Sequence, residues 1–518
     1  MKQVWNIFAK DIRRHWREVA ASLALLVAFA WLEVRSWPHN ERMSLAFLDM
    51  FASQILPGLV TALVPISWIF LIVRVVQGES LVGDRQFWVT RPYDWKKLLL
   101  AKAIFVLVFV NLPLFVLDLF LLAKAGFRPL SYLPGLLWIQ WMWILLLFVS
   151  AAGLAAVTAT VGQMLLAILA VALYVIGMIA LSEVVPNSNF PTGDSIPGFL
   201  LVAIALAVIL LQYSRRRTAL SRWLILGLGV ALTLQMVATP YRSAIARQYP
   251  LSSAAKSPLT WSLLPSHSPA PDEALYESGQ VPILFPFSIS GLPQGSFLQL
   301  NGVILTLTNG QGQSWDSGWL FHSQSFFPEQ KAADIALNLK KSDFDRMKTS
   351  PVQARLLLAY TLYHDKNQRT FVVPSGDFAL PDLGLCSPHA TYGQMLDCRV
   401  PLRRPTSLMI TSEMATSTCP LGPNATPGRP GQMAFDSIQN SDTSPAEVGI
   451  SPVKIIGVYL TLREPSSSVG NNQICPGTPL VLSNPEETAR GRVELQFDNL
   501  SLADYRRGSG VKYIRQKP

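Results

Sequence analysis

The 518-residue chain has few charged residues and lacks the short motifs by which many soluble enzymes are recognised. Only 15% of its residues are charged, whereas soluble globular chains have about 25%. It contains no Gly-Lys dipeptide, which excludes a phosphate-binding loop of the G-x-x-x-x-G-K-[ST] type. H-E-x-x-H, G-x-S-x-G and a Gly-rich dinucleotide-binding turn are also absent. The sequence therefore indicates a membrane protein that is not an enzyme, and we expect no catalytic residues and no cofactor.

Histidine and cysteine are both scarce. The six histidines are scattered without the spacing of a metal site, so we expect no bound metal. The four cysteines all lie in the polar C-terminal part of the chain, which predicts two disulfides in an oxidising compartment. Three pairings are possible, and we favour Cys386 with Cys398, twelve residues apart, which leaves Cys419 with Cys475.

Long apolar runs fill the chain before residue 240 and predict a transmembrane domain over residues 20–239. About 20 apolar residues are needed to cross about 30 Å of hydrocarbon. No charged residue occurs between Leu133 and Ser182, a length that fits two spans. We predict about seven transmembrane helices, over residues 20–36, 55–76, 98–122, 133–157, 162–182, 197–212 and 223–238.

One acidic residue, Asp118, lies well inside a predicted span. An ionisable side chain within a membrane is a functional candidate by default, so proton or ion coupling is one interpretation. The other interpretation is that Asp118 lies near the outer end of its span, where water or Lys124 satisfies the carboxylate. We favour the second interpretation, because the predicted spans contain few other charged residues.

The positions of Lys and Arg predict how the spans are oriented. Thirteen of these residues lie on the side of the N-terminus and four on the opposite side, so the positive-inside rule makes the N-terminus cytoplasmic. Seven crossings then place the C-terminal part outside, in the periplasm or an equivalent extracytoplasmic space. We expect a multi-pass protein of the cell inner membrane.

The basic residues have two alternative interpretations, a signal peptide and a nucleic-acid binding surface. A basic stretch before an apolar run also fits a signal peptide, but no small-x-small cleavage site follows, so we expect a retained anchor. The net charge of +10 does not indicate nucleic acid, because many of the charges lie beside spans, where they meet lipid headgroups. We therefore expect a lipid membrane as a partner and no nucleic acid.

The chain after the spans has the pattern of a β-rich domain. Residues 240–280 are rich in Pro and Ser and predict a linker, and residues 281–518 predict the extracytoplasmic domain. Alternation such as Val493, Leu495 and Phe497 against polar neighbours is typical of half-buried strands. The expected fold is thus an α-helical polytopic membrane domain followed by a C-terminal β-rich, sandwich-like domain.

Residues 1–19 predict an amphipathic helix on the cytoplasmic side. One face of this helix would carry aromatic and aliphatic side chains and another face basic ones, which is typical of a helix lying at a membrane surface. A simple topology anchor is the alternative. The apolar face consists of Trp5, Phe8, Ile12 and Trp16, with Val19.

A short charged and aromatic link, "LVGDRQFWVTRPYDWKKLLLAK" over residues 81–102, joins the second and third predicted spans. Gly and Pro break the chain on either side of "RQFWVT", and Asp94 is placed to cap the helix that follows. Phe87 and Trp88 between two arginines have the composition of a protein–protein contact. The alternative is an ordinary aromatic belt at the headgroups.

An amphipathic helix before the first span, together with "FWVTRP" and "LLLAK" between the second and third, resembles the permease subunits of ABC-2 type (type V) transporters. The resemblance covers about residues 1–212. It implies that residues 84–92 are a coupling helix docking on a separate ABC ATPase subunit, and that the chain forms a homodimer or a paired permease. The matching coupling residues are Asp84, Arg85, Phe87, Trp88, Arg91 and Pro92; the matching interface-helix residues are Trp5, Phe8, Ile12 and Trp16.

This chain departs from that family pattern in having a seventh predicted span and a large outer domain, where six spans are usual. Our first hypothesis is a permease subunit that couples ATP hydrolysis on a partner to the export of an unknown substrate. The alternative is a non-transporting membrane anchor that displays the β-domain for binding or signalling.

Overall fold

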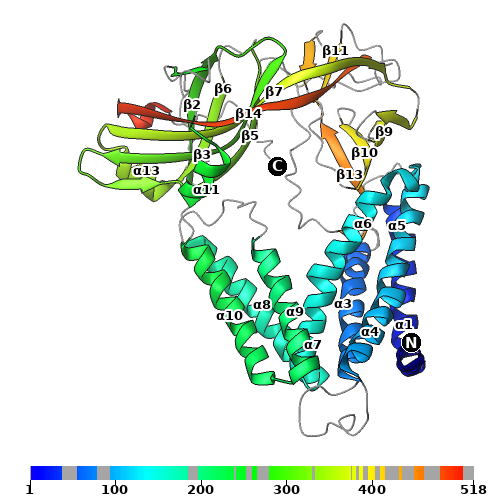
Figure 1. Ribbon diagram of the computed structural model, residues 1–518. Coiled ribbons are helices and arrows are strands. Elements are labelled where there is room, and N and C mark those ends of the chain that lie inside the picture. Colours follow the sequence, from blue (N-terminus) through cyan, green and yellow to red (C-terminus); the bar gives the residue numbers. More distant parts are fainter. Residues whose placement is uncertain are drawn as a thin grey trace, which may run out of the picture.

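A computed structural model of the chain shows a helical N-terminal half and a β-rich C-terminal half. In Figure 1 the helical half lies at the bottom and the β-rich half at the top. The residues that it describes are 2–37, 55–78, 94–184, 196–238, 241–251, 259–264, 279–328, 333–374, 376–380, 384–388, 395–402, 409–414, 431–434, 449–459 and 479–505.

Within those residues, seven helices are long and apolar enough to cross a membrane, which confirms the predicted number of apolar helices. Two of the seven contain π-helical turns, and one of these two also begins with a short 3₁₀ turn. The seven are α1 (Lys2–Ser36), α3 (Leu56–Gln77), α4–η3–α5 (Trp95–Val106, Leu107–Asn111, Leu112–Lys124), η4–α6–η5–α7 (Pro129–Tyr132, Leu133–Met142, Trp143–Phe148, Val149–Val157), α8 (Val161–Val184), α9 (Ile196–Arg215) and α10 (Thr218–Ala238).

The first helix differs from the sequence prediction of a surface helix over 1–19 followed by a span over 20–36. α1 runs through both segments, because residues 2–36 contain neither Gly nor Pro to end a helix. It is kinked at His15, whose φ of −112° and ψ of 17° are not helical. The predicted division between surface helix and span is therefore a kink within one helix.

Two of the spans contain a wide π-helical stretch, η3 and η5. η3 ends two residues before Pro113, which has no N–H to donate to the preceding turn, so a wider turn there avoids the clash of the proline ring. η5 carries Trp143 and Phe148, and both rings pack edge-on against Trp68 of α3, at 5.5 Å and 6.0 Å. The two stretches lie in consecutive spans joined by a short connection.

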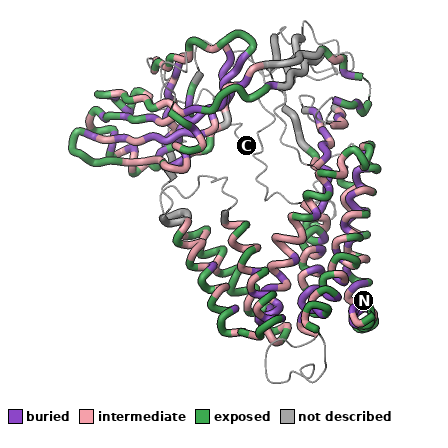
Figure 2. The backbone as a smooth tube through the Cα atoms, in the orientation of Figure 1, coloured by how far each residue is buried: buried purple, intermediate pink, exposed green. Residues whose placement is uncertain are grey.

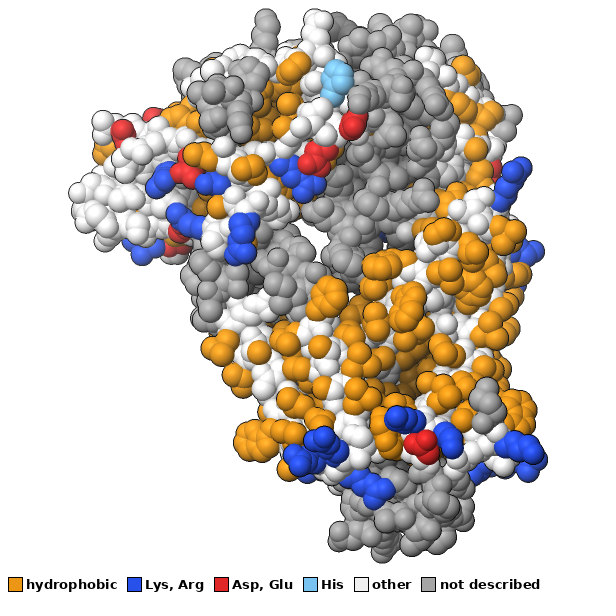
Figure 3. Space-filling model, viewed as in Figure 1, with side chains coloured by type: hydrophobic (Ala, Val, Ile, Leu, Met, Phe, Trp, Pro, Cys, Tyr) orange, Lys and Arg blue, Asp and Glu red, His pale blue; other side chains and the backbone are white. Residues whose placement is uncertain are grey.

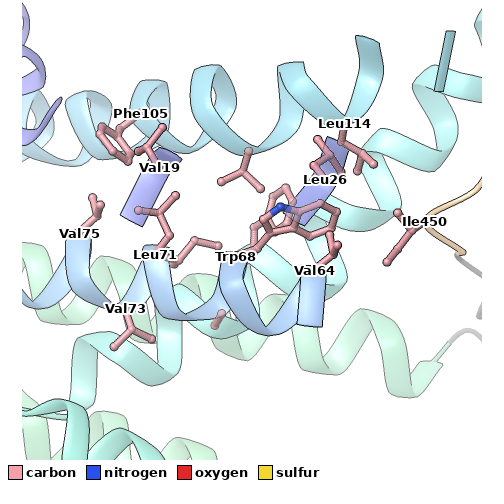
Figure 4. Packing of buried hydrophobic residues seen from close by; sticks show 14 of the residues in the cluster. Val19, Leu26, Val64, Trp68, Leu71, Val73, Val75, Phe105, Leu114 and Ile450 are labelled. Atoms are coloured by element: carbon pink, nitrogen blue, oxygen red, sulfur yellow. The ribbon is translucent and has the colours of Figure 1, made fainter. Parts of the chain in front are cut away.

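The helical core lies between α1, α3, α4–α5 and α6–α7. Figure 4 shows Trp68, Leu71 and Phe105 among the buried side chains that fill this space. In contrast, α8 and α10 bury few of their residues, and Figure 2 shows both helices mostly exposed or intermediate. Their large exposed hydrophobic side chains are Leu, Ile and Val, with Trp223, and the visible face of the helical half is largely hydrophobic (Figure 3). Such a surface suits contact with lipid.

The described residues of the C-terminal half form three antiparallel sheets, which confirms a β-rich region. The first has the strand order β1 (Thr260–Leu263), β2 (Gln280–Ser290), β6 (Ala333–Lys340). The second has the order β13 (Val453–Tyr459), β10 (Met395–Pro401), β9 (Gly384–Pro388), β8 (Phe378–Leu380). The third has the order β12 (Gly431–Ala434), β11 (Met409–Met414), β14 (Pro479–Leu500), β7 (Val352–Val372), β3 (Ser296–Asn309), β4 (Ser314–Asp316), with β5 (Leu320–Phe326) also paired to β3.

The first and third sheets share a hydrophobic core. Alternate residues of β2, such as Phe285 and Phe287, are fully buried together with Leu298 of β3 and Leu356 of β7. The period of two along each strand places these side chains on one face. Helix α13 (Lys341–Met347) adds Phe344 to the same core.

The predicted linker over 240–280 contains regular structure. Helix α11 (Tyr241–Gln248) packs Ile245 against the other face of the third sheet, and Tyr249 stacks on Trp319 at 6.2 Å. Arg242 of α11 forms an ion pair of 2.5 Å with Asp316. Strand β1 lies in the same segment and pairs with β2. The chain therefore enters the β region through a helix that belongs to it.

Candidate functional site

The N-terminal segment of α1, residues 2–15, packs against the helical core by a face that the sequence did not fully predict. Phe8 is buried and stacks on Phe109 at 6.0 Å, and Ile12 is partly buried. Trp5 and Trp16, assigned to the same apolar face, are 66% and 58% exposed. The four predicted interface residues are therefore divided, with two packed inward and two at the surface. The buried stripe is Val4, Ile7, Phe8, Asp11 and His15.

A buried ion pair fixes this segment to the third span. Lys102 Nζ of α4 donates to Asp11 Oδ2 at 2.8 Å, and the two side chains are only 4% and 3% exposed. The partners are 91 residues apart in the chain. The sequence prediction included Lys102 only as the end of the 81–102 link and gave Asp11 no role. The one sequence signal that Asp11 lies inward is its spacing: it follows Phe8 by three residues and Ile7 by four, which places it on the same helical face.

A second set of contacts ties the same region to α3. Arg74 Nε lies 3.6 Å from Glu18 Oε1, and Arg14 donates from Nη1 to the carbonyl oxygen of Gly78 at 2.9 Å. His15, at the kink, is almost fully buried with its ring edge-on to Phe105 at 6.5 Å. We call the three contacts Asp11–Lys102, Glu18–Arg74 and Arg14–Gly78 the α1 anchor. The anchor reaches the last turn of α3 and the third turn of α4.

The predicted coupling residues Asp84, Arg85, Phe87, Trp88, Arg91 and Pro92 lie outside the described residues. Both flanks of that stretch are described, and both belong to the region just outlined. Gly78 accepts from Arg14 at one flank. At the other, Asp94 caps α4 by accepting a hydrogen bond from the backbone N–H of Lys96 at 3.1 Å, which confirms the predicted cap.

The end of the third and fourth spans opposite to the α1 anchor contacts the β region. Leu385 of β9 and Leu402, just after β10, reach the connection between α5 and α6 and the first turn of α6. A Cβ atom on Gly126 would lie 2.6 Å from Leu385 Cδ1, and one on Gly135 would lie 2.3 Å from Leu402 Cδ1. Ile450 joins the buried cluster of the helices. The absence of side chains on the two glycines therefore allows the second sheet to seat on this connection, which we call the sheet–hairpin contact.

The second sheet is closed by a disulfide. Cys386 of β9 and Cys398 of β10 face each other in register and are bonded, which confirms one of the two predicted bridges. The bond lies one residue from Leu385 and so stiffens the strand pair that makes the sheet–hairpin contact. Cys419 and Cys475 lie outside the described residues, so their pairing stays a prediction.

A chain of polar side chains crosses between the two spans within the apolar layer. Asn111 Nδ2 donates to Gln140 Oε1 at 2.6 Å, and Gln140 Nε2 donates to Asp118 Oδ2 at 2.8 Å. Asp118 is 1% exposed. The sequence led us to favour Lys124 or water as the group satisfying Asp118, whereas Gln140 from the neighbouring span does so. Lys124 instead lies over the ring of Phe120 at 5.9 Å.

Spans α4–α5 and α6–α7 form an antiparallel hairpin that holds Lys102 near one end and the sheet–hairpin contact at the other. From Lys102 to Gly126 the helix is about 36 Å long at about 1.5 Å per residue. In the described part of the chain, no three His, Cys, Asp or Glu side chains are grouped as metal ligands.

Comparison with protein-family models finds no match, and comparison with curated proteins finds no significant match. The chain has seven helices compatible with a multi-pass membrane protein among its described residues, joined to a β-rich region of antiparallel sheets with a disulfide.

Proposed function

We propose that this chain is the membrane-spanning permease subunit of an ABC-type exporter of the ABC-2 class, driven by a separate ATPase subunit. The observation that carries the proposal is the α1 anchor. It ties the N-terminal segment to the last turn of α3 and to the beginning of α4, the two spans that flank the stretch resembling a coupling helix. A displacement of that stretch by a partner is thereby transmitted to three helices at once.

The low exposure of Asp11 and Lys102 supports this role. An ion pair removed from water holds its geometry only when both partners stay together, since separating them leaves a buried charge. The N-terminal segment therefore moves with α4 as one body. The exposed Trp5 and Trp16 leave an aromatic surface beside that body for lipid headgroups or an ATPase.

The orientation belongs to the same proposal. Basic side chains gather at the end of the helical half that lies away from the β region (Figure 3). By the positive-inside rule this end is cytoplasmic and the β region is extracytoplasmic. An ATPase docks at the basic end, two permeases pair within the membrane, and the β region receives or guides the exported substrate. The disulfide supports an oxidising compartment for the β region.

The sheet–hairpin contact extends the path of coupling. Because the hairpin begins beside the α1 anchor and turns under the second sheet, a tilt of its helices moves the surface on which that sheet rests. In the alternative function, a membrane anchor displaying the β region, this contact serves only to hold the β region in place.

Co-expression of the full-length chain with the ATPase encoded nearest to it tests the proposal. The two chains are expected to co-purify in detergent as a complex containing two copies of each. A matched variant, Phe87→Ala with Trp88→Ala, is expected to leave the amount of membrane-inserted chain unchanged and to release the ATPase. A chain that retains no ATPase in either form contradicts the permease function and favours the membrane anchor.

A further inference from the structure

Asn111, Gln140 and Asp118 form a set of hydrogen-bonded side chains within the helices, and the proposed coupling assigns no role to them. Its three members come from two consecutive spans: Asn111 and Asp118 lie seven residues apart on one face of the third span, and Gln140 lies on the fourth. Seven residues are close to two helical turns, so both side chains face Gln140. Asp118 and Gln140 are 1% and 4% exposed.

The hydrogen bonds run in one direction and end at the carboxyl group. Asn111 donates to Gln140 Oε1, so the amide group of Gln140 is turned with its Nε2 toward Asp118 Oδ2. Asp118 thus accepts one hydrogen bond on Oδ2, and no other hydrogen bond to it is found among the described residues. Its second oxygen is available to carry a proton.

No cation balances a negative charge at this position in the described structure. α5 packs against α1, α6, η3 and η4. The charged groups of the second half of α1 are Glu33 and Arg35, and the Arg35 guanidinium lies over the ring of Trp31 at 3.8 Å. α6, η3 and η4 carry no charged residue. Lys124, on α5 itself, is six residues away, which is about 9 Å along the helix.

The three hydrogen-bonded side chains lie at two irregular helical turns. Asn111 is the last residue of η3, and Gln140 lies three residues before η5 begins. π-helical turns displace side chains from the ordinary helical positions and occur often at functional sites. Here the two wide turns lie on either side of the same polar chain. A change from π- to α-helical geometry in η3 would rotate Asn111 relative to Asp118 and break its hydrogen bond with Gln140.

We propose that Asp118 is a proton-binding site: in the state described here the carboxyl group is neutral, with its proton on Oδ1 and Oδ2 accepting from Gln140. Release breaks the O–H bond and passes the proton to a water molecule that enters when the hairpin opens, and water then solvates the carboxylate that remains. The proposal needs the helices to lie in lipid, but it does not depend on an ATPase partner.

Infrared difference spectroscopy of the purified full-length chain in lipid tests the protonation state directly. The spectrum of the wild type minus that of Asp118→Asn is expected to contain the C=O stretch of a protonated carboxylic acid at neutral pH, shifted in heavy water. Asparagine preserves the shape of the side chain and can keep a hydrogen bond with Gln140. Carboxylate bands in place of the acid band would overturn the proposal.

Labelling of the wild type with dicyclohexylcarbodiimide, which reacts with protonated carboxyl groups in apolar surroundings, gives a second readout that needs no variant. The adduct is expected on the peptide containing Asp118 at neutral pH, and Gln140→Leu is expected to change the labelling rate severalfold. Glu33, nearer the end of α1, serves as the internal control. Labelling of Asp118 only at acidic pH, with none at neutral pH, would show an ionised carboxylate and contradict the proposal.

Discussion

Asp11 and Lys102 form an ion pair of 2.8 Å between the N-terminal segment of α1 and the start of the third span, with both side chains almost fully buried. The pair joins a segment expected at the membrane surface to the helix that follows the coupling stretch. The kink at His15, four residues after Asp11, turns α1 at the same level. The contact therefore decides whether the N-terminal segment moves with the third span or apart from it.

Breaking this pair should destabilise the helical half. Asp11→Asn or Lys102→Met alone leaves one buried charge uncompensated and is expected to lower the free energy of unfolding by roughly 3–5 kcal/mol. The double replacement Asp11→Leu with Lys102→Met should cost much less, because no charge remains buried. Thermal unfolding in detergent measures all three, with the exposed Arg13→Gln as control. Single variants no less stable than that control would show that the pair is not formed.

Gly302 is required by a close approach of an aromatic ring. A Cβ atom at this position would lie 2.1 Å from Cζ2 of Trp319, which is buried between β3 and α11. Gly302→Ala is therefore expected to lower the stability of the β region by about 1–3 kcal/mol. Gly310→Ala, where no atom lies within 4 Å, is the matched control. Equal melting temperatures for the two variants would contradict this packing.

The stability of the third sheet should depend weakly on acid pH through Glu494. The hydrogen bond donated by Arg355 at 2.6 Å lowers the pKa of Glu494 from its ordinary value of 4.5, against the opposing effect of burial. A lowered pKa stabilises the fold above pH 4.5, and this contribution is lost as the pH falls below that value. Both side chains are partly exposed, so solvent screening limits the effect to a few tenths of a kcal/mol.

Unfolding of wild type and Glu494→Gln across the acid range measures this contribution. The difference in stability between them should be largest near neutral pH and should shrink toward acid. A difference that stays constant with pH would show that Arg355 does not hold the carboxylate.

The disulfides give a prediction that mass mapping checks. Non-reducing digestion should yield Cys386 joined to Cys398, as the structure has them, and Cys419 joined to Cys475, as the sequence predicts. Removing the first bridge by Cys386→Ser with Cys398→Ser should cost about 2–4 kcal/mol, as expected for a short closed loop. Free thiols at all four positions would place the β region in a reducing compartment and overturn the proposed orientation.

Hydropathy predicted the helices well, because the length of a span is set by the thickness of the hydrocarbon and is visible in a run of apolar residues. The predicted segment 162–182 appears as α8 over Val161–Val184, and 133–157 appears within η4–α7. The Cys386–Cys398 bond could also be predicted, because its partners are only twelve residues apart in the sequence.

Polar contacts between residues far apart in the sequence could not be predicted from the sequence. The sequence prediction gave Asp11 no role, because its partner lies 91 residues away. Gln140 drew no attention among apolar residues, yet it is the group that satisfies Asp118. Trp5 and Trp16 were assigned to the apolar face of the N-terminal helix, but the buried face instead includes Phe8 and Asp11. These outcomes depend on which helices become neighbours, and a single sequence does not encode that in its periodicity.

ATP hydrolysis by the reconstituted complex tests whether an ATPase acts on this chain through the stretch between α3 and α4. The rate for the co-expressed ATPase in liposomes is expected to rise severalfold with the wild-type chain. Phe87→Ala with Trp88→Ala should abolish the rise, whereas Phe321→Ala, which truncates an exposed aromatic in the β region, should leave it intact. Hydrolysis that is unaffected by the wild-type chain, or stimulated equally by the Phe87/Trp88 variant, would contradict the account.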